Sequence, residues 1–171
     1  MAEIFTRPRN RKAWLDYLFY DVGQQQFDFY VSGLIKQDDE TISTKWKKYS
    51  EVVFPVDFDK DWKLEWINQR QIFPHEIVLD VEDIWKLDPI LKKLPEFATH
   101  YWVFLTGSRG AHVHCFFNRN LPEEQKRIFI KYFDTDSMKV YEKTMIALEF
   151  AKHWKTGNQK ELLYASWWEL N

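Results

Sequence analysis

The sequence predicts an α+β fold in which a mixed or antiparallel sheet is flanked by helices and the chain forms two small lobes. Three observations predict this fold class. Residues 77–83, IVLDVED, are a short β-branched run that is typical of a strand. Residues 101–117 contain two apolar runs on either side of the turn TGSRG, which predicts a hairpin. Helical segments at 88–97 and 123–133 precede and follow this hairpin, and such a mixture indicates an α+β domain.

The first lobe, about residues 1–74, is expected to contain both kinds of element. Residues 9–22 are predicted to form a helix that runs into a strand, and residues 27–35 to form a strand. Residues 38–54 are expected to be a polar connection that leads to another possible strand. Residues 59–73 are predicted to be helical, because three apolar residues would share one stripe: Trp62, Trp66 and Ile67.

The second lobe, about residues 75–171, carries the start signals of two helices. Asp88 and Pro89 open the helix at 88–97, and Asn120 and Pro122 precede the helix at 123–133. The remaining segments are predicted as strand or loop at 134–140, helix at 142–152, loop at 153–158 and a last segment at 161–170. At 171 residues, the whole chain is expected to be a single domain.

The composition is that of a globular protein, with 45% hydrophobic and 29% charged residues. The net charge of −2 argues against a protein that binds nucleic acid by charge alone, but not against a polymerase with an acidic metal site. The single cysteine, Cys115, excludes a disulfide framework. No apolar run reaches transmembrane length and the N-terminus lacks a signal-peptide segment, so we expect an intracellular (cytoplasmic) protein with no membrane partner.

Asp80 and Glu82 are a pair of carboxylates two residues apart in the strand predicted at 77–83. Alternate side chains of a strand share a face, so both carboxylates are expected to point the same way. Two like charges this close repel each other, and a divalent cation between them would relieve that repulsion. We therefore expect that removing either carboxylate leaves the stability of the metal-free protein unchanged or raises it. The alternative is a strand that emerges at the sheet edge with both acids in solvent.

The turn TGSRG combines backbone freedom with polar side chains. Gly107 and Gly110 allow backbone N–H groups to approach an anion, Thr106 and Ser108 offer hydroxyls, and Arg109 adds a guanidinium. These residues together predict a loop that is able to bind phosphate.

His112 and His114 are expected to share one face of the strand that follows this turn. Two histidines on one face, directly after a Gly-Ser-Arg-Gly turn, have two interpretations of about equal weight. One is a phosphate or metal site, and the other is ordinary packing.

Two later segments add further candidates. His153 and Lys155 lie in the loop HWKTGN, which is either an ordinary helix exit at Gly157 or a second cationic pair for phosphate. Asp134 and Asp136 lie in FDTDSM, which by itself fits a solvated turn. Carboxylates that hold metals and cations that neutralise a triphosphate are the requirements of phosphoryl transfer. The sequence has no nucleophile elbow, no GxxxxGK[ST] loop and no HExxH motif.

The order of these motifs resembles the archaeo-eukaryotic primase superfamily, which includes primase small subunits, plasmid primase–polymerases and bacterial end-joining polymerase domains. The resemblance covers about residues 75–158 and depends on the acidic pair in IVLDVED, on TGSRGAH and on HWKTG. It implies that the catalytic metals, two Mg²⁺ or Mn²⁺ ions, are held by Asp80, Glu82 and a third carboxylate, Asp136 or Asp134. It implies that the nucleotide is bound by Ser108, Arg109, Gly110, His112, His153 and Lys155.

The sequence departs from the family pattern in three places. Thr106 stands where a serine is usual, Lys152 precedes His153 where an apolar residue is common, and the Cys-rich zinc knob of many primase subunits is missing.

The resemblance implies a primase-polymerase-like catalytic core and a DNA primase or polymerase, a nucleotidyltransferase that joins nucleoside triphosphates on a nucleic-acid template. Its expected partners are a DNA template and primer, nucleoside triphosphates and a larger primase or replication subunit. Two alternatives stay open. One is a non-catalytic nucleic-acid-binding subunit related to primases, and the other is a metal-dependent nuclease or phosphohydrolase that uses His112, His114 and the carboxylates.

Overall fold

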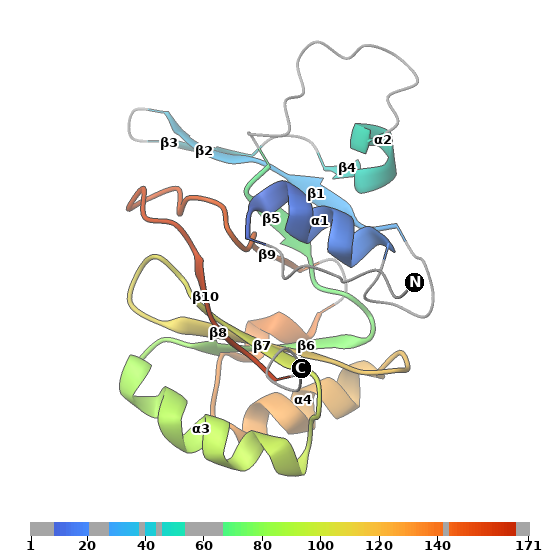
Figure 1. Ribbon diagram of the computed structural model, residues 1–171, viewed down its shortest axis with the longest axis vertical. Helices are drawn as coiled ribbons and strands as arrows, with labels where there is room; N and C mark the ends of the chain where they lie inside the picture. Colours follow the sequence, from blue (N-terminus) through green and yellow to red (C-terminus); the bar gives the residue numbers. More distant parts are fainter. Residues whose placement is uncertain are drawn as a thin grey trace, which may run out of the picture.

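The computed structural model describes residues 9–20, 28–37, 40–43, 46–53, 67–141 and 144–166. In this part of the chain, two four-stranded antiparallel sheets and a two-stranded hairpin combine with four α-helices (Figure 1). The structure therefore confirms the α+β class and the antiparallel pairing. The division into lobes at about residue 74, within a single domain, stays a prediction.

The first sheet has the strand order β4-β1-β5-β9. Its strands are β1 (Tyr30–Ser32), β4 (Lys47–Lys48), β5 (Gln69–Gln71) and β9 (Met145–Ala147). Helices α1 (Arg11–Tyr20) and α2 (Tyr49–Val53) lie beside it in Figure 1, and β2 (Leu34–Gln37) pairs with β3 (Glu40–Ser43) in a separate hairpin.

The second sheet has the strand order β10-β7-β8-β6. Its strands are β6 (Glu76–Val81), β7 (Tyr101–Leu105), β8 (Ala111–Phe116) and β10 (Glu161–Ala165). Helices α3 (Leu87–Lys93) and α4 (Glu123–Tyr132) cover the face turned away from the first sheet (Figure 1). The described residues also contain three short 3-10 helices: η2 (Ile84–Lys86), η3 (Leu94–Glu96) and η4 (Ser137–Val140).

The alternation of side chains along the second sheet divides its two faces. Leu79 of β6 and Val113 of β8 belong to the core that includes Ile90 of α3 and Ile130 of α4. On the opposite face, Trp102 and Phe104 of β7 pack with α1 and with strands of the first sheet in a second core. Apolar burial against the helices thus fixes the register of β6 and β8, and this register decides which polar side chains face the first sheet.

The aromatic residues account for much of the second core. Trp14 of α1 is completely buried, with ring centroids 4.7 Å from Trp102 and 5.4 Å from Phe104. Phe29 stacks on Tyr49 at 5.3 Å. Aromatic residues make up 18% of the sequence, and many of them therefore pack between the two sheets.

Two predicted helices are corrected by the structure. Residues 59–66, including Trp62 and Trp66, lie outside the described part, while the end of that segment forms strand β5 instead of a helix. The helix predicted at 142–152 is replaced by strand β9 and a turn that contains Phe150 at a positive φ of 62°. Both errors have one cause, because β5 and β9 pair with each other and this pairing overrides the local helical spacing.

Two further segments also differ from their prediction. The polar connection expected at 38–54 contains β3, β4 and α2. The segment 134–140, expected as strand or loop, contains the 3-10 helix η4, which begins after Asp136 because the Asp136 side chain accepts a hydrogen bond from the Met138 backbone N–H at 2.9 Å.

Candidate functional site

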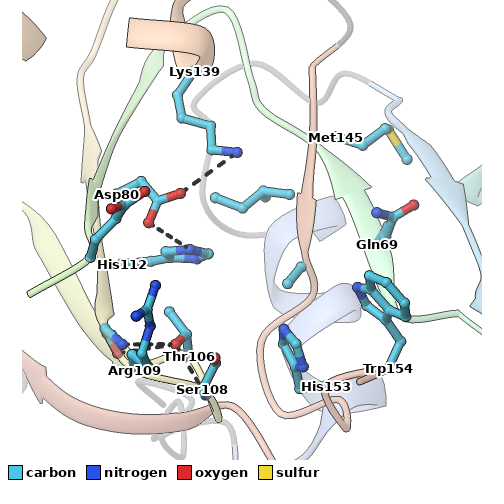
Figure 2. A pocket seen from close by; sticks show the side chains of 14 residues that line it. Gln69, Asp80, Thr106, Ser108, Arg109, His112, Lys139, Met145, His153 and Trp154 are labelled. Carbon is cyan, nitrogen blue, oxygen red and sulfur yellow. Dashed lines mark hydrogen bonds and ion pairs between the residues drawn. The ribbon is translucent and has the colours of Figure 1, made fainter. Parts of the chain in front are cut away.

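A hollow of about 310 Å³ lies between the two sheets, where β6 and β8 face β9 (Figure 2). Seven of the predicted site residues border it, and they come from segments far apart in the sequence: Asp80, Glu82, Ser108, Arg109, Gly110, His112 and His153. Asp80 pairs directly with His112 in the register of β6 and β8, so both side chains point to the same face. In Figure 2, His112 and Arg109 lie on one side of the hollow, and His153 and Trp154 lie on the other.

The turn between β7 and β8 closes tightly on the end of β6. Thr106 Oγ1 donates a hydrogen bond to the Gly110 carbonyl at 3.1 Å and accepts one from the Ser108 N–H at 3.3 Å. A Cβ atom on Gly110 would lie only 2.0 Å from the Val81 carbonyl oxygen. Glycine is therefore required here by close backbone approach, and this approach brings the turn next to Glu82.

The two glycine-containing loops are joined directly. The Thr156 hydroxyl in the HWKTGN loop donates to the Gly107 carbonyl oxygen at 2.7 Å. A Cβ on Gly107, which has a φ of 77°, would lie 2.7 Å from the Asn158 carbonyl oxygen. The HWKTGN loop itself is closed by a hydrogen bond from the Gly157 N–H to the His153 carbonyl at 2.8 Å. The sequence motifs TGSRG and HWKTGN thus form one continuous edge of the hollow.

Lys155 is placed differently from its motif partner His153. Lys155 is exposed and does not border the hollow, and its ammonium lies 4.8 Å from the centre of the Trp154 ring. His153 borders the hollow, and burial and the nearby Lys155 charge lower its pKa. The structure therefore brings His153, but not Lys155, to the wall of the site.

Asp80 lies close to a cation and a hydrogen-bond donor. Its two carboxylate oxygens lie 3.5 Å from His112 Nε2 and 3.7 Å from Lys139 Nζ. Burial acts to raise the pKa of Asp80, but the hydrogen bond from His112 and the positive charges of Lys139 and Lys160 outweigh it, so the pKa is lowered. The repulsion expected between Asp80 and Glu82 stays a prediction. The contacts of Asp80 with His112 and Lys139 oppose it, so we expect removal of Asp80 to lower stability instead of preserving or raising it.

A second hollow of about 240 Å³ adjoins the first and contains the four candidate metal-binding carboxylates, Asp80, Glu82, Asp134 and Asp136. Asp134 is exposed and lies 3.6 Å from the Lys86 ammonium. Both Asp134 and Asp136 border this hollow, so the identity of the third carboxylate stays open between them. Among the residues that the structure describes, no group of three His, Cys, Asp or Glu side chains forms a ready-made metal cluster.

A buried ionic network, which the sequence did not predict, extends inward from the hollow. Arg70 of β5 is fully buried between Glu76 of β6 and Glu149, with distances of 2.7 and 2.9 Å from its Nη2 to the two carboxylates. Trp14 Nε1 also donates to Glu149 at 2.8 Å. His114 joins this network and does not border the hollow, because its Nδ1 lies 2.7 Å from Glu76 Oε1. The two histidines of β8 therefore have different surroundings although they share a face.

The charged groups of this network stabilise one another in their ionised forms. Burial opposes ionisation of Glu76 and Glu149, but the Arg70 charge and its hydrogen bonds, together with His114, outweigh it and lower the pKa of both carboxyls. For the same reason the pKa of Arg70 is raised despite burial. Each of these groups therefore stays charged across the physiological pH range.

Six wall residues were missed by sequence reasoning: Gln69, Lys139, Met145, Ile146, Ala147 and Trp154. Trp154 lies within HWKTGN, so its place in that motif was the available signal. Gln69 and Lys139 carried no comparable signal, because nothing local in the sequence distinguishes them from surface residues.

The chain was also compared with known proteins. No protein-family model matches it, and no curated protein and no solved structure is significantly similar to it. Within the described residues, no helix has the length and apolar character needed to cross a membrane.

Proposed function

We propose that this chain is a primase–polymerase-type nucleotidyltransferase that joins nucleoside triphosphates on a nucleic-acid template. One observation carries the proposal: three motifs from distant parts of the sequence border a single hollow. Carboxylates lie at one end of this hollow, and the turn with Ser108 and Arg109 lies at the other. A triphosphate and the metal ions that accompany it need these two kinds of group side by side.

The triphosphate is assigned to the turn and to β8. Arg109 is exposed beside the hollow and free to form bidentate hydrogen bonds with phosphate oxygens, which its guanidinium geometry matches. Ser108 and Gly110 bring hydroxyl and backbone groups to the same wall. His112 adds an imidazole directly beside Asp80, and His153 faces it across the hollow.

The donor set at the acidic end fits Mg²⁺ or Mn²⁺, because it consists of carboxylate oxygens, the ligands that these hard cations prefer. Asp80, Glu82 and Asp136, or Asp134 in its place, would hold the ions. Such ions activate an attacking hydroxyl and neutralise charge on the leaving pyrophosphate.

The wall opposite Arg109 suits the nucleobase. It contains the Trp154 ring, the Met145 side chain and the Gln69 amide (Figure 2). An aromatic face stacks on any base, and an amide is able to hydrogen-bond to base or ribose. The two walls thus correspond to the two chemically different ends of a nucleoside triphosphate.

Extension of a primed DNA template with deoxynucleoside triphosphates or ribonucleoside triphosphates and Mn²⁺ tests the proposal. Asp80→Asn should abolish extension, whereas Asp88→Asn, the same change at an exposed site on α3, should leave it intact. Circular dichroism of both variants controls for folding. Extension by a folded Asp80→Asn variant at the wild-type rate would contradict the assignment, and degradation of the template would favour the metal-dependent hydrolase.

One observation favours a second candidate, a non-catalytic nucleic-acid-binding subunit. The Lys139 ammonium, 3.7 Å from Asp80, already supplies a positive charge where a catalytic ion would be needed. If this ammonium permanently replaces the ion, the wild-type chain should retain primed template without extending it, in Mg²⁺ and in Mn²⁺.

A further inference from the structure

Lys160 is a buried lysine that lies beside the candidate site but has no direct role in the proposed reaction. It lies just before β10 and is 1% exposed. Its Nζ is 2.7 Å from the Ala147 carbonyl oxygen and 2.9 Å from His112 Nδ1. His114 Nε2 lies at 3.3 Å and Glu149 Oε1 at 3.5 Å. The ammonium therefore bridges the ionic network and the histidine that borders the hollow.

The contact between Lys160 and His112 restricts the position of a proton. A lysine ammonium has three donors and no acceptor, so His112 Nδ1 has to accept its hydrogen bond with a lone pair. A neutral imidazole carries one N–H, which is then on Nε2. The Nε2 atom is on the side of the hollow, 3.5 Å from Asp80 Oδ1.

The electrostatics agree with this arrangement. Burial lowers the pKa of Lys160 to about 8, although Glu149 opposes the change, so the ammonium form predominates at neutral pH. Because this ammonium donates to His112 Nδ1 at 2.9 Å, that nitrogen carries no proton and the ring is neutral.

We infer that Lys160 is a positioning residue that fixes His112 as the Nε2–H tautomer and so turns a neutral hydrogen-bond donor toward the hollow. Within the protein this donor faces Asp80 Oδ1 at 3.5 Å. The acceptor that replaces Asp80 when ligand binds rests on the proposed function: it is an anionic oxygen of a nucleoside triphosphate. An Nε2 that carries a proton has no lone pair for a metal. His112 is therefore assigned to phosphate recognition, and the arrangement disfavours the hydrolase in which His112 and His114 would ligate a metal.

His114 provides an internal reference on the same strand. Its Nδ1 lies 2.7 Å from Glu76 Oε1, whereas its Nε2 lies 3.0 Å from Glu149 Oε1 and 3.3 Å from the Lys160 ammonium. The closer carboxylate requires a proton on Nδ1, and Nε2 is able to accept from Lys160. Neighbouring histidines of one sheet face should thus carry their protons differently, His112 on Nε2 alone and His114 on Nδ1.

The test is ¹⁵N NMR of the histidine rings in the whole chain at neutral pH, with assignment by His112→Gln and His114→Gln. The expected spectrum shows a neutral His112 ring protonated only at Nε2, and a His114 ring protonated at Nδ1. Lys160→Met should shift the His112 ring signals or split them between two tautomers. Lys126→Met is the matched control, because Lys126 is also buried but donates to the Phe73 carbonyl at 2.8 Å, and it should leave those signals unchanged.

An Nδ1–H or doubly protonated His112 in the wild type would overturn the inference, and so would an unchanged His112 spectrum in folded Lys160→Met. If Lys160→Met does not fold, a ¹⁵N coupling across the hydrogen bond from Lys160 Nζ to His112 Nδ1 in the wild type decides instead. Addition of a nucleoside triphosphate separates the two proposals: with the expected tautomer present, an unmoved Nε2 signal would refute the nucleotide site and leave the role of Lys160 standing.

Discussion

Gly110→Ala is the substitution whose consequence follows most directly from the geometry. The added methyl group would lie 2.0 Å from the Val81 carbonyl oxygen. This is 1.0 Å shorter than 3.0 Å, the distance below which one of the two groups has to move. The obstacle is backbone on the strand that carries Asp80, so it is unable to move aside as a flexible side chain would. Overpacking of this kind costs about 1–3 kcal/mol, and we expect the upper half of that range.

The expected displacement also reaches the candidate site. Ser108 and Arg109 immediately precede Gly110, so a shift of this turn away from β6 moves both from the wall of the hollow. We expect triphosphate affinity to fall at least ~10-fold, which corresponds to about 1.4 kcal/mol. Urea unfolding measures the loss of stability, and calorimetric titration with a nonhydrolysable nucleoside triphosphate measures the loss of affinity.

Gly157→Ala is the matched control for the added methyl group. A Cβ at Gly157 meets no atom within 4 Å, but its φ of 72° is unfavourable for alanine. Its expected cost is therefore backbone strain alone, about 1–2 kcal/mol. Gly110 has no positive φ, so any loss of stability at Gly110 comes from the clash. Wild-type urea midpoint and wild-type affinity in Gly110→Ala would refute the argument that close approach to β6 positions the turn.

Three further predictions concern the buried ionic network and the wall of the hollow that contains Trp154. Arg70→Met should destabilise the fold by about 3–5 kcal/mol in urea unfolding, because it leaves buried carboxylates unpaired; a loss below 1 kcal/mol would contradict this. Because Arg70 lowers the pKa of Glu76 and Glu149, their stabilisation is complete above the ordinary carboxyl pKa of 4.5 and is lost as pH falls below it. Urea midpoints that do not decrease on acidification would exclude this linkage. Trp154→Ala should weaken nucleoside triphosphate binding ~10-fold or more and leave tripolyphosphate binding unchanged, since about 1–3 kcal/mol of stacking is lost; equal losses would move Trp154 to the phosphate end.

The parts of the fold that were predicted correctly have strong local signals. The alternation of Leu79 with Asp80, and of Val113 with His112, follows from the two-residue period of a strand and is confirmed by the two cores. The turn with its two glycines predicted the β7–β8 hairpin for the same local reason. Because this hairpin register places His112 opposite Asp80, half of the candidate site was accessible from sequence alone.

The parts that were mispredicted depend on partners distant in the chain. Strands β5 and β9 have only three residues each, and Arg70 pairs with Ile146 across 76 positions of sequence. Short segments with apolar residues at mixed spacing do not distinguish a strand from a helix, so only the pairing itself decides. The wall formed by Met145 and Gln69 was missed together with these strands.

The ionic network could not be predicted from the sequence for a different reason. Arginine, lysine and glutamate are almost never fully buried unless paired, and here the partners are far apart in sequence. Its position suggests why it is present. Arg70 belongs to the first sheet, and Glu76 begins the edge strand of the second, so their bidentate contact at 2.8 and 2.7 Å joins the two sheets directly. The two walls of the hollow are carried by these same two sheets. A directional ion pair resists relative sliding more than apolar contacts do, because its hydrogen bonds are lost with small displacements. We therefore expect the network to hold the strand that carries Asp80 at a fixed distance from Gln69 and Met145 on the facing strands.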